Sequence, residues 1–289
     1  MHPHVRAQRQ ETALLTTALN LLTEMAPMAA DCPPGEYCAP VVQEEFFPAA
    51  FLFEGTPFAI NRIIMVRLIA VAVLMIVFYL ALRRPKLVPG KLQSLIEMGV
   101  GFIRDGVVYE MLGEKIGKKY LPYILAVFFG VLFMNITGVI PLLNISANGI
   151  IGMPLVFAVA TYIAFIYAGF REAGGATFLR NALFPPGVPW PLYILLTPIE
   201  FINTFIVRPA SLALRLFLNL MVGHLLLVLA FSATAFFVGL MNAWSAMGVL
   251  TFAGGFFMTL IEVLVAVLQA YVFALLTTSY IQLSVAKSH

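Results

Sequence analysis

The feature that most constrains this chain is a run of 51 residues, Tyr120 to Phe170, without one Lys, Arg, Asp or Glu. About 20 apolar residues in a helix are enough to cross a bilayer, so this run is long enough for two crossings. It predicts two transmembrane helices joined by a turn near Pro141–Gly149. The composition of the 289-residue chain agrees, because 61% of its residues are hydrophobic and only 11% are charged. The sequence therefore predicts a multi-pass membrane protein.

Three further apolar segments predict the other crossings. They are Ile63–Leu82, a part of Leu192–Phe237, and Trp244–Leu283. The last two are longer than a crossing needs, so we expect a long, tilted C-terminal helical hairpin at about 190–284. Its first arm is expected to bend at Arg208–Pro209, because proline removes a backbone hydrogen bond.

The segment Leu92–Leu112 differs from the crossings. It has apolar residues at helical spacing, but charged residues fall among them. This pattern is typical of an amphipathic helix that lies along the membrane surface or packs under a bundle. The predicted fold is thus all-α, with five transmembrane helices plus one amphipathic membrane-surface helix.

The distribution of charge predicts the orientation. Eight Lys and Arg residues lie between positions 83 and 119, directly after the first crossing. The positive-inside rule places this segment in the cytoplasm, the N-terminus outside and, after five crossings, the C-terminus inside. We therefore divide the chain into an extracytoplasmic N-terminal segment, residues 1–60, and a membrane domain, residues 61–289. A net charge of +3 is too weak to suggest binding to nucleic acid.

The N-terminal segment leaves two questions open. Cys32 and Cys38 are too few for a zinc site, and are either free thiols or a local disulfide on the oxidising side of a membrane. Residues 1–31 have a basic start and a weak apolar stretch, so they make a poor signal peptide. The chain has no glycine-rich phosphate motif and no cluster of metal ligands, so we expect no cofactor and no metal.

Ionisable residues inside the hairpin are the candidates for function. A charge at the bilayer centre costs at least ~2.5–3.5 kcal/mol, so such residues need a reason to be there. Arg208 is close enough to a helix end to reach lipid headgroups, whereas Arg215, His224 and Glu262 cannot easily escape the membrane. The five ionisable residues between 182 and 286 are Glu200, Arg208, Arg215, His224 and Glu262.

An antiparallel hairpin places these residues at two levels. If the two arms run antiparallel, Arg215 lies opposite Gln269 and His224 lies opposite Glu262. Both pairs fit a single alignment of the two helices to within two residues. The two levels are about 10–14 Å apart along the helices. Ser211, Arg215 and Asn219 follow at intervals of four and share a face. His224 lies about 180° around the helix from Arg215, so we expect it to face a different cavity.

These residue types suggest a route for protons. An arginine does not release its proton, so Arg215 is a fixed cation that attracts a carboxylate and interrupts a proton wire. His224 and Glu262 can both exchange protons. Purely structural roles for the same residues stay open. Arg215 could clamp the helices through Gln269 or Glu262, and His224 could donate a hydrogen bond to a backbone carbonyl. Asn219 and Gln269 could bond one helix to another, and Glu200 could be solvated near a turn.

Four stretches carry a resemblance to a known family. RPASLALRLFLNLMVGHLLLVLA at 208–230 resembles subunit a of the F-type ATP synthases, the stator part of the membrane proton channel. IEVLVAVLQAYVFALLTTSYI at 261–281 is similar to the last helix of that family. FMNITGVIPLL at 133–143 and GKLQSLIEMGVGFI at 90–103 resemble its second-helix motif and its amphipathic segment. The resemblance covers roughly residues 55–285.

The resemblance implies roles for the residues singled out above. Arg215 would be the arginine that faces the rotating ring of c subunits, with Gln269 opposite it. The family carries an acid and a histidine at the positions of His224 and Glu262, and this chain has the pair in the reverse order to some members. Glu200 corresponds to a family acid only with an offset of one residue.

Two departures from the family pattern affect the same regions. Leu218 stands where a small residue is usual, so packing against the ring is expected to differ. Gly138 stands where an acid is often found in the second-helix motif. Access from outside would then use other residues, such as Asn144, Ser146 or Asn148.

The function implied by the resemblance is proton translocation by the stationary channel subunit of a rotary ATP synthase, in a bacterial inner (plasma) membrane. Such a subunit makes no bond itself, and its partners would be the c-subunit ring, the b subunits of the peripheral stalk and the membrane lipid. A secondary transporter, with Arg215 binding an anionic substrate, is the alternative; it predicts internal repeats, which we do not see. A structural scaffold predicts that Arg215→Lys and Gln269→Leu leave transport intact. The choice between H⁺ and Na⁺ and the size of the ring stay open.

Overall fold

The computed structural model describes part of the chain. The described residues are 37, 50–52, 60–83, 89–140, 148–183, 192–240, 242 and 244–285. Cys32, Cys38, Asn144 and Ser146 lie outside them, as does the leader-like segment 1–31. The chain forms two compact units, which are described separately: the larger holds Ala49–Leu226 and Phe256–His289, and the smaller holds Met1–Pro48 and Leu227–Gly255.

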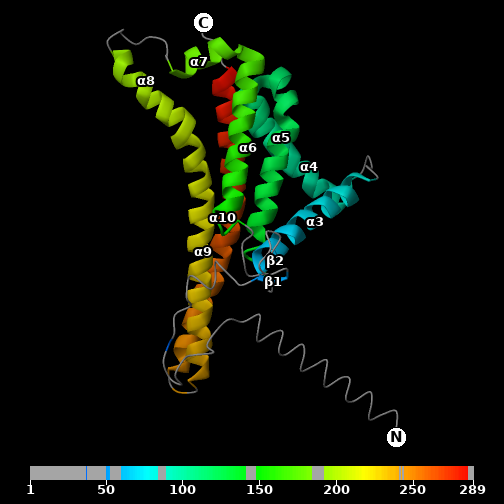
Figure 1. The fold of residues 1–289 in the computed structure, drawn as a ribbon. Coiled ribbons are helices and arrows are strands. Elements are labelled where there is room, and N and C mark those ends of the chain that lie inside the picture. Colours follow the sequence, from blue (N-terminus) through cyan, green and yellow to red (C-terminus); the bar gives the residue numbers. More distant parts are fainter. Residues whose placement is uncertain are drawn as a thin grey trace. The chain divides into compact units, whose positions relative to one another are not determined.

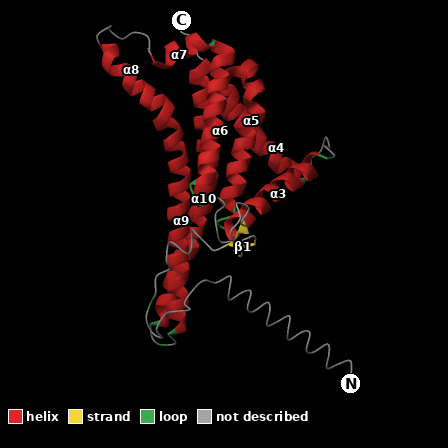
Figure 2. Cartoon of the chain, viewed as in Figure 1, coloured by secondary structure: helices red, strands yellow, loops and turns green. Residues whose placement is uncertain are grey.

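Five helical stretches are long and apolar enough to cross a membrane, which confirms the expected polytopic, helical fold (Figure 2). Two short strands, β1 and β2, were not predicted; β1 is Ala50–Leu52 and β2 is Ile60–Asn61, and they pair antiparallel. The five stretches are Arg62–Leu82, Lys91–Ile136, Gly152–Ala173, Tyr193–Gly239 and Ser245–Val285.

The first crossing, α3, is Arg62–Leu82. Asn61 caps it, since its side-chain oxygen accepts a hydrogen bond from the backbone N–H of Ile64 at 2.9 Å. This bond satisfies one of the N–H groups that a helix start leaves without a partner. The helix is apolar on nearly every side, and large side chains such as Met75 and Leu80 are exposed, as expected of a helix that faces lipid.

The amphipathic segment and the second crossing are continuous in the chain. They comprise α4 (Lys91–Ile103), a π-helical turn η1 (Arg104–Tyr109) and α5 (Glu110–Ile136). Gly113 interrupts α5 with φ 72° and ψ 163°, a backbone conformation that side chains with a Cβ rarely adopt. The predicted amphipathic segment, Leu92–Leu112, ends at this glycine, and the uncharged run begins at Tyr120.

The third crossing follows a turn, as the uncharged run predicts. It consists of α6 (Gly152–Ala168) and a π-helical turn η2 (Gly169–Ala173). Lys119 on α5 forms an ion pair with Glu172 on η2 at 2.7 Å, which ties the charged ends of these two crossings together. A short helix, α7 (Gly175–Leu183), comes next and was not predicted.

The fourth crossing bends where the sequence predicts it. It begins as α8 (Tyr193–Ile202), passes through a π-helical turn η4 (Asn203–Val207) and continues as α9 (Arg208–Gly239). Figure 1 shows the change of direction between α8 and α9. Because Pro209 lacks an N–H and its ring crowds the preceding turn, the helix loses its regular bonding there. The fifth crossing is α10 (Ser245–Val285).

Aromatic and aliphatic side chains of α5, α6, α9 and α10 form the core of the larger unit. Phe273 of α10 is fully buried and lies edge-on to Phe157 of α6, with ring centroids 6.1 Å apart. Gly130 of α5 packs against the Phe157 ring, and a Cβ there would lie 3.3 Å from it. Small residues at such contacts let membrane helices approach each other closely.

The smaller unit contains the turn between α9 and α10 and the described residue Tyr37. The Thr234 hydroxyl of α9 donates to the Thr251 hydroxyl of α10 at 2.9 Å. The Tyr37 hydroxyl lies 2.9 Å from that of Ser232, within hydrogen-bond distance, and its ring meets Phe236 edge-on. Tyr37 therefore contacts α9 within this unit.

Candidate functional site

Arg215 lies on an exposed face of α9. Leu214, Leu218 and Val222 are exposed on the same helix, and Asn219 is exposed one turn beyond Arg215. Arg215 forms no ion pair with any described carboxylate, so the clamp to Glu262 has no support in these contacts. A cation without a protein counter-charge on an apolar membrane helix is suited to meet a carboxylate of another chain.

Asn219 and Gln269 join the two arms of the hairpin at the level beyond Arg215. The Asn219 amide nitrogen donates to the Gln269 side-chain oxygen at 3.1 Å. Gln269 is 4% exposed, and its own amide nitrogen finds no hydrogen-bond partner among the described residues. The bond links α9 to α10, and it holds Gln269 beside Asn219, one turn away from Arg215.

His224 and Glu262 form the second level of the site. They are 2% and 5% exposed. Neither carboxylate oxygen of Glu262 accepts a hydrogen bond from a described residue. The exposed Arg215 and the buried His224 therefore lie on different faces of α9, as their separation of nine residues predicts.

Gly223 makes room for the acid of this pair. A Cβ at position 223 would lie only 3.2 Å from one carboxylate oxygen of Glu262. The carboxylate thus packs directly against the α9 backbone. From the sequence, Gly223 could be predicted only as part of the family pattern, without a reason for a glycine there.

Two fully buried amides lie close to the Glu262 helix. Asn148 donates to the side-chain oxygen of Asn135 at 2.8 Å, and Asn135 donates to the backbone carbonyl of Ala266 at 3.4 Å. Ala266 is one turn after Glu262 on α10, so the pair of amides is bonded to the helix that carries the acid. Of the three polar residues suggested for outer access, Asn148 is the one that the structure describes.

Two of the expected site residues lie further from this centre. Ser211 is exposed one turn before Arg215, and its hydroxyl donates to the backbone carbonyl of Arg208 at 3.0 Å. Glu200 is half-buried on α8, before η4. Fifteen residues separate it from Arg215, or about 22 Å of helix. The structure does not bring Glu200 next to Arg215.

A chain of hydroxyl groups was missed from the sequence. Tyr123 of α5 donates to Thr161 of α6 at 3.4 Å, and the hydroxyls of Thr161 and Thr277 of α10 lie 3.4 Å apart. Thr277 also donates to the carbonyl of Phe273 at 2.8 Å. Uncharged polar residues inside apolar helices were the available signal, since such groups bond across membrane helices.

The geometry defines a class of protein. Five membrane-spanning stretches hold a buried pair of proton-exchanging groups and, on another face of the same helix, an exposed cation that cannot carry protons. The described residues contain no group of three or more His, Cys, Asp or Glu that could hold a metal ion. These features define an ion-translocating membrane subunit.

Comparison with known proteins identifies the family. The family model "ATP synthase A chain" matches residues 63–282. The chain is 43% identical to ATP synthase subunit a of Rhodococcus erythropolis over 258 residues, which is 89% of this chain and 92% of the relative. It is 35% identical to ATP synthase subunit a of Pseudarthrobacter chlorophenolicus, over 86% of this chain and 93% of the relative. The corresponding protein of Hyphomonas neptunium is 40% identical over 71% of this chain and 78% of the relative.

The chain therefore belongs to the ATP synthase subunit a family. It is a multi-pass membrane protein and the proton-channel stator subunit of an F-type ATP synthase. It is not the subunit in which bonds are made or broken. Membership of this family also excludes the alternative function, a secondary transporter for an anionic substrate.

Proposed function

We propose that Arg215 separates two proton half-channels at a contact with the c-subunit ring. The observation that carries this proposal is the position of Arg215 on an exposed face of α9, with no described carboxylate paired to it. An ionised carboxylate of the ring would supply the missing counter-charge. The attraction is strong because membrane surroundings screen charges far less than water does.

The proposed sequence of events moves only protons. A proton enters from outside through His224 and Glu262, and protonates a ring carboxylate. The neutral carboxyl group can then turn into the lipid. After rotation the carboxyl group approaches Arg215, releases its proton toward the cytoplasm and pairs with the guanidinium. Arg215 keeps its own proton throughout, so protons cannot pass directly between the two half-channels.

The remaining polar residues extend this path. Asn219 borders Arg215 on the exposed face and presents its amide group toward the ring, while the buried Gln269 bonds to Asn219 from α10. Ser211 and Glu200 precede Arg215 on the side that the charge pattern assigns to the cytoplasm, and we assign them to the exit of the released proton. The path thus runs past residues of α9 and α10, with Glu200 on α8 at its inner end.

The contact with the ring can be tested by disulfide cross-linking in the assembled complex. Val222 is 52% exposed on the face of Arg215, whereas Leu68 is 60% exposed on α3. With a cysteine introduced on the lipid-facing side of the c subunit, Val222→Cys is expected to cross-link and Leu68→Cys is not. Cross-linking at Leu68 alone would place the ring on another face and overturn the assignment.

The orientation and the remaining partners belong to the same proposal. We place the chain in the bacterial inner membrane, with residues 1–60 outside, residues 61–289 as the membrane domain and the C-terminus in the cytoplasm. The b subunits would hold it to the peripheral stalk.

Lys115 lies in the basic segment that the positive-inside rule assigns to the cytoplasm. A membrane-impermeant thiol reagent should label Lys115→Cys in inverted vesicles and not in intact cells; the opposite pattern would reverse the orientation.

A further inference from the structure

Arg208 is a second arginine on the side of α9 that carries Arg215. The two residues are seven positions apart, which is about 20° short of two full helical turns and about 10 Å along the helix. Arg208 is the first residue of α9 and is half-buried, whereas Arg215 is exposed. The proposed proton steps use only Arg215, so a second cation on the same side of the helix needs its own explanation.

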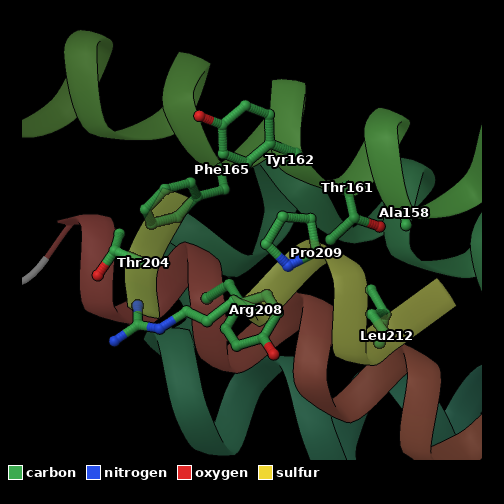
Figure 3. A pocket seen from close by; sticks show the side chains of 9 residues that line it. Ala158, Thr161, Tyr162, Phe165, Thr204, Arg208, Pro209 and Leu212 are labelled. Carbon is green, nitrogen blue, oxygen red and sulfur yellow. The ribbon is translucent and has the colours of Figure 1, made fainter. Parts of the chain in front are cut away.

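An aromatic ring of α10 holds the Arg208 side chain. The guanidinium carbon lies 5.7 Å from the centroid of the Tyr280 ring, a distance at which a cation is attracted to the face of a ring. In Figure 3 the guanidinium group extends away from Leu212 and lies beside Thr204. The positive charge of Arg208 therefore has a defined place at the start of α9.

The contact between Arg208 and Tyr280 fits the same alignment of α9 and α10 as the bond between Asn219 and Gln269. From Arg208 to Asn219 the position on α9 rises by 11 residues, and from Tyr280 to Gln269 the position on α10 falls by 11. Arg208 and Asn219 thus share the edge of α9 that meets α10. Arg215 lies between them along this edge.

The charge of Arg208 is not balanced within the described part of the chain. No described carboxylate forms an ion pair with it, and this includes Glu200, which is eight residues earlier on α8. The titratable side chains that line the same region are Tyr162 of α6 and Tyr280, and tyrosine is neutral at pH 7. An ionised carboxylate that reaches this edge of α9 would therefore meet two cations, Arg208 and Arg215.

We propose that Arg208 promotes the release of the proton from the ring carboxyl group toward the cytoplasm. This role rests on the proposed ring contact at Arg215 and on the proposed orientation, in which the start of α9 lies on the cytoplasmic side of Arg215. A ring carboxyl group in the inner half-channel is then close to both arginines. A nearby cation favours the ionised form of a carboxyl group and so lowers its affinity for a proton. Arg208 keeps its own proton and acts through its charge alone.

The test compares Arg208→Gln with the parent in the whole ATP synthase complex, reconstituted into vesicles with the cytoplasmic side outward. ATP synthesis and ATP-driven proton pumping are each measured while the outside pH is varied and the lumen pH is fixed. Without the charge of Arg208 the ring carboxyl group holds its proton more tightly. Synthesis should then need a higher outside pH, and pumping should continue to a higher outside pH. Both profiles should shift by about one pH unit, the effect of one charge at about 10 Å in an effective dielectric of about 20.

The shift of the profiles separates this role from a structural one. A variant that only disturbs the helices would lower both rates at every pH and leave the profiles in place. That result, or profiles equal to those of the parent, would overturn the proposal. Arg208→Lys keeps the charge and should keep the parent profiles. ATP hydrolysis measured with an uncoupler should have the same pH dependence in every variant, because it reports the catalytic part of the complex.

Further variants test the ring contact of Arg208 and the specificity of the effect. Tyr280→Leu removes the stacking ring and should give part of the shift, whereas Tyr280→Phe keeps the ring and should give none. Arg180→Gln removes an exposed arginine of α7 and is the matched control. A shift with Arg180→Gln as large as that with Arg208→Gln would contradict the assignment.

Two controls keep the outcome decisive. Co-purification with the c-subunit ring shows whether each variant assembles, and Tyr280→Leu tests the role even where Arg208→Gln does not assemble. If Val222→Cys fails to cross-link to the ring, the proposed function itself is wrong. If Val222→Cys cross-links while Arg208→Gln keeps the parent profiles, only the role of Arg208 is wrong.

Discussion

Asn219 donates a hydrogen bond to Gln269 at 3.1 Å, and this bond connects the two arms of the hairpin one turn beyond Arg215. Asn219 is on the exposed face of α9, whereas Gln269 is buried on α10. The bond therefore fixes the register of the two helices beside the proposed ring contact. It also orients Gln269, whose amide nitrogen has no described partner of its own.

Asn219→Leu is expected to weaken the hairpin. The substitution removes the donor to Gln269, and hydrogen bonds between membrane helices contribute about 0.6 kcal/mol on average and up to ~1.7 kcal/mol. Heat stability of the purified complex would report the loss. A double-mutant cycle with Gln269→Leu should show that the two substitutions cost less together than the sum of their separate effects. Strict additivity would mean that the bond contributes nothing.

Gly223→Ala is expected to lower proton pumping several-fold. The new Cβ would lie 3.2 Å from a Glu262 oxygen, so the carboxylate must move away from α9. ATP-driven acidification of inverted vesicles measures the effect. Gly254→Ala on α10 is the control, because a Cβ there meets nothing within 4 Å. Equal pumping by the two variants would show that the position of the carboxylate against Gly223 is unimportant.

The pair His224 and Glu262 predicts rescue by exchange. His224→Ala and Glu262→Ala should each reduce proton pumping strongly, because each removes one of two proton-exchanging groups. His224→Glu combined with Glu262→His restores both groups in the reverse order and should pump better than either alanine variant. Alanine variants that pump as well as the parent would remove the pair from the proton path.

Gly113→Ala is expected to destabilise the amphipathic segment. Gly113 has φ 72°, and holding a residue with a Cβ in such a region costs about 1–3 kcal/mol. Gly106→Ala, where a Cβ meets nothing within 4 Å and φ is not positive, should be neutral by comparison. Limited proteolysis of the assembled complex would detect the difference as faster cleavage near residue 113. Identical cleavage of both variants would contradict this interpretation of the break.

The crossings and the two levels of polar residues could be predicted because both depend on position along the chain alone. Bilayer thickness fixes the length of a crossing, and the cost of burying charge singles out Arg215, His224 and Glu262. The bend before α9 followed from Pro209. Each of these predictions used one local rule.

The sequence could not reveal contacts that depend on how helices approach each other. Asn148 reaches Asn135 only because a turn folds back onto the end of α5, and Gln269 bonds to Asn219 because of the side-chain geometry at that crossing. The short helix α7 packs through Phe178 against Gly169, where a Cβ would clash with the ring. Such close approaches leave no periodic signal in a sequence.

The central claim is that Arg215 separates two proton half-channels, and one measurement tests it most directly. ATP-driven acidification is compared in inverted membrane vesicles that carry the parent subunit, Arg215→Ala or the matched control Leu214→Ala, an exposed neighbour on α9. Co-purification confirms that each complex is intact. The account predicts that Arg215→Ala abolishes pumping in an assembled complex while Leu214→Ala retains most of it. Undiminished pumping by Arg215→Ala would contradict the account.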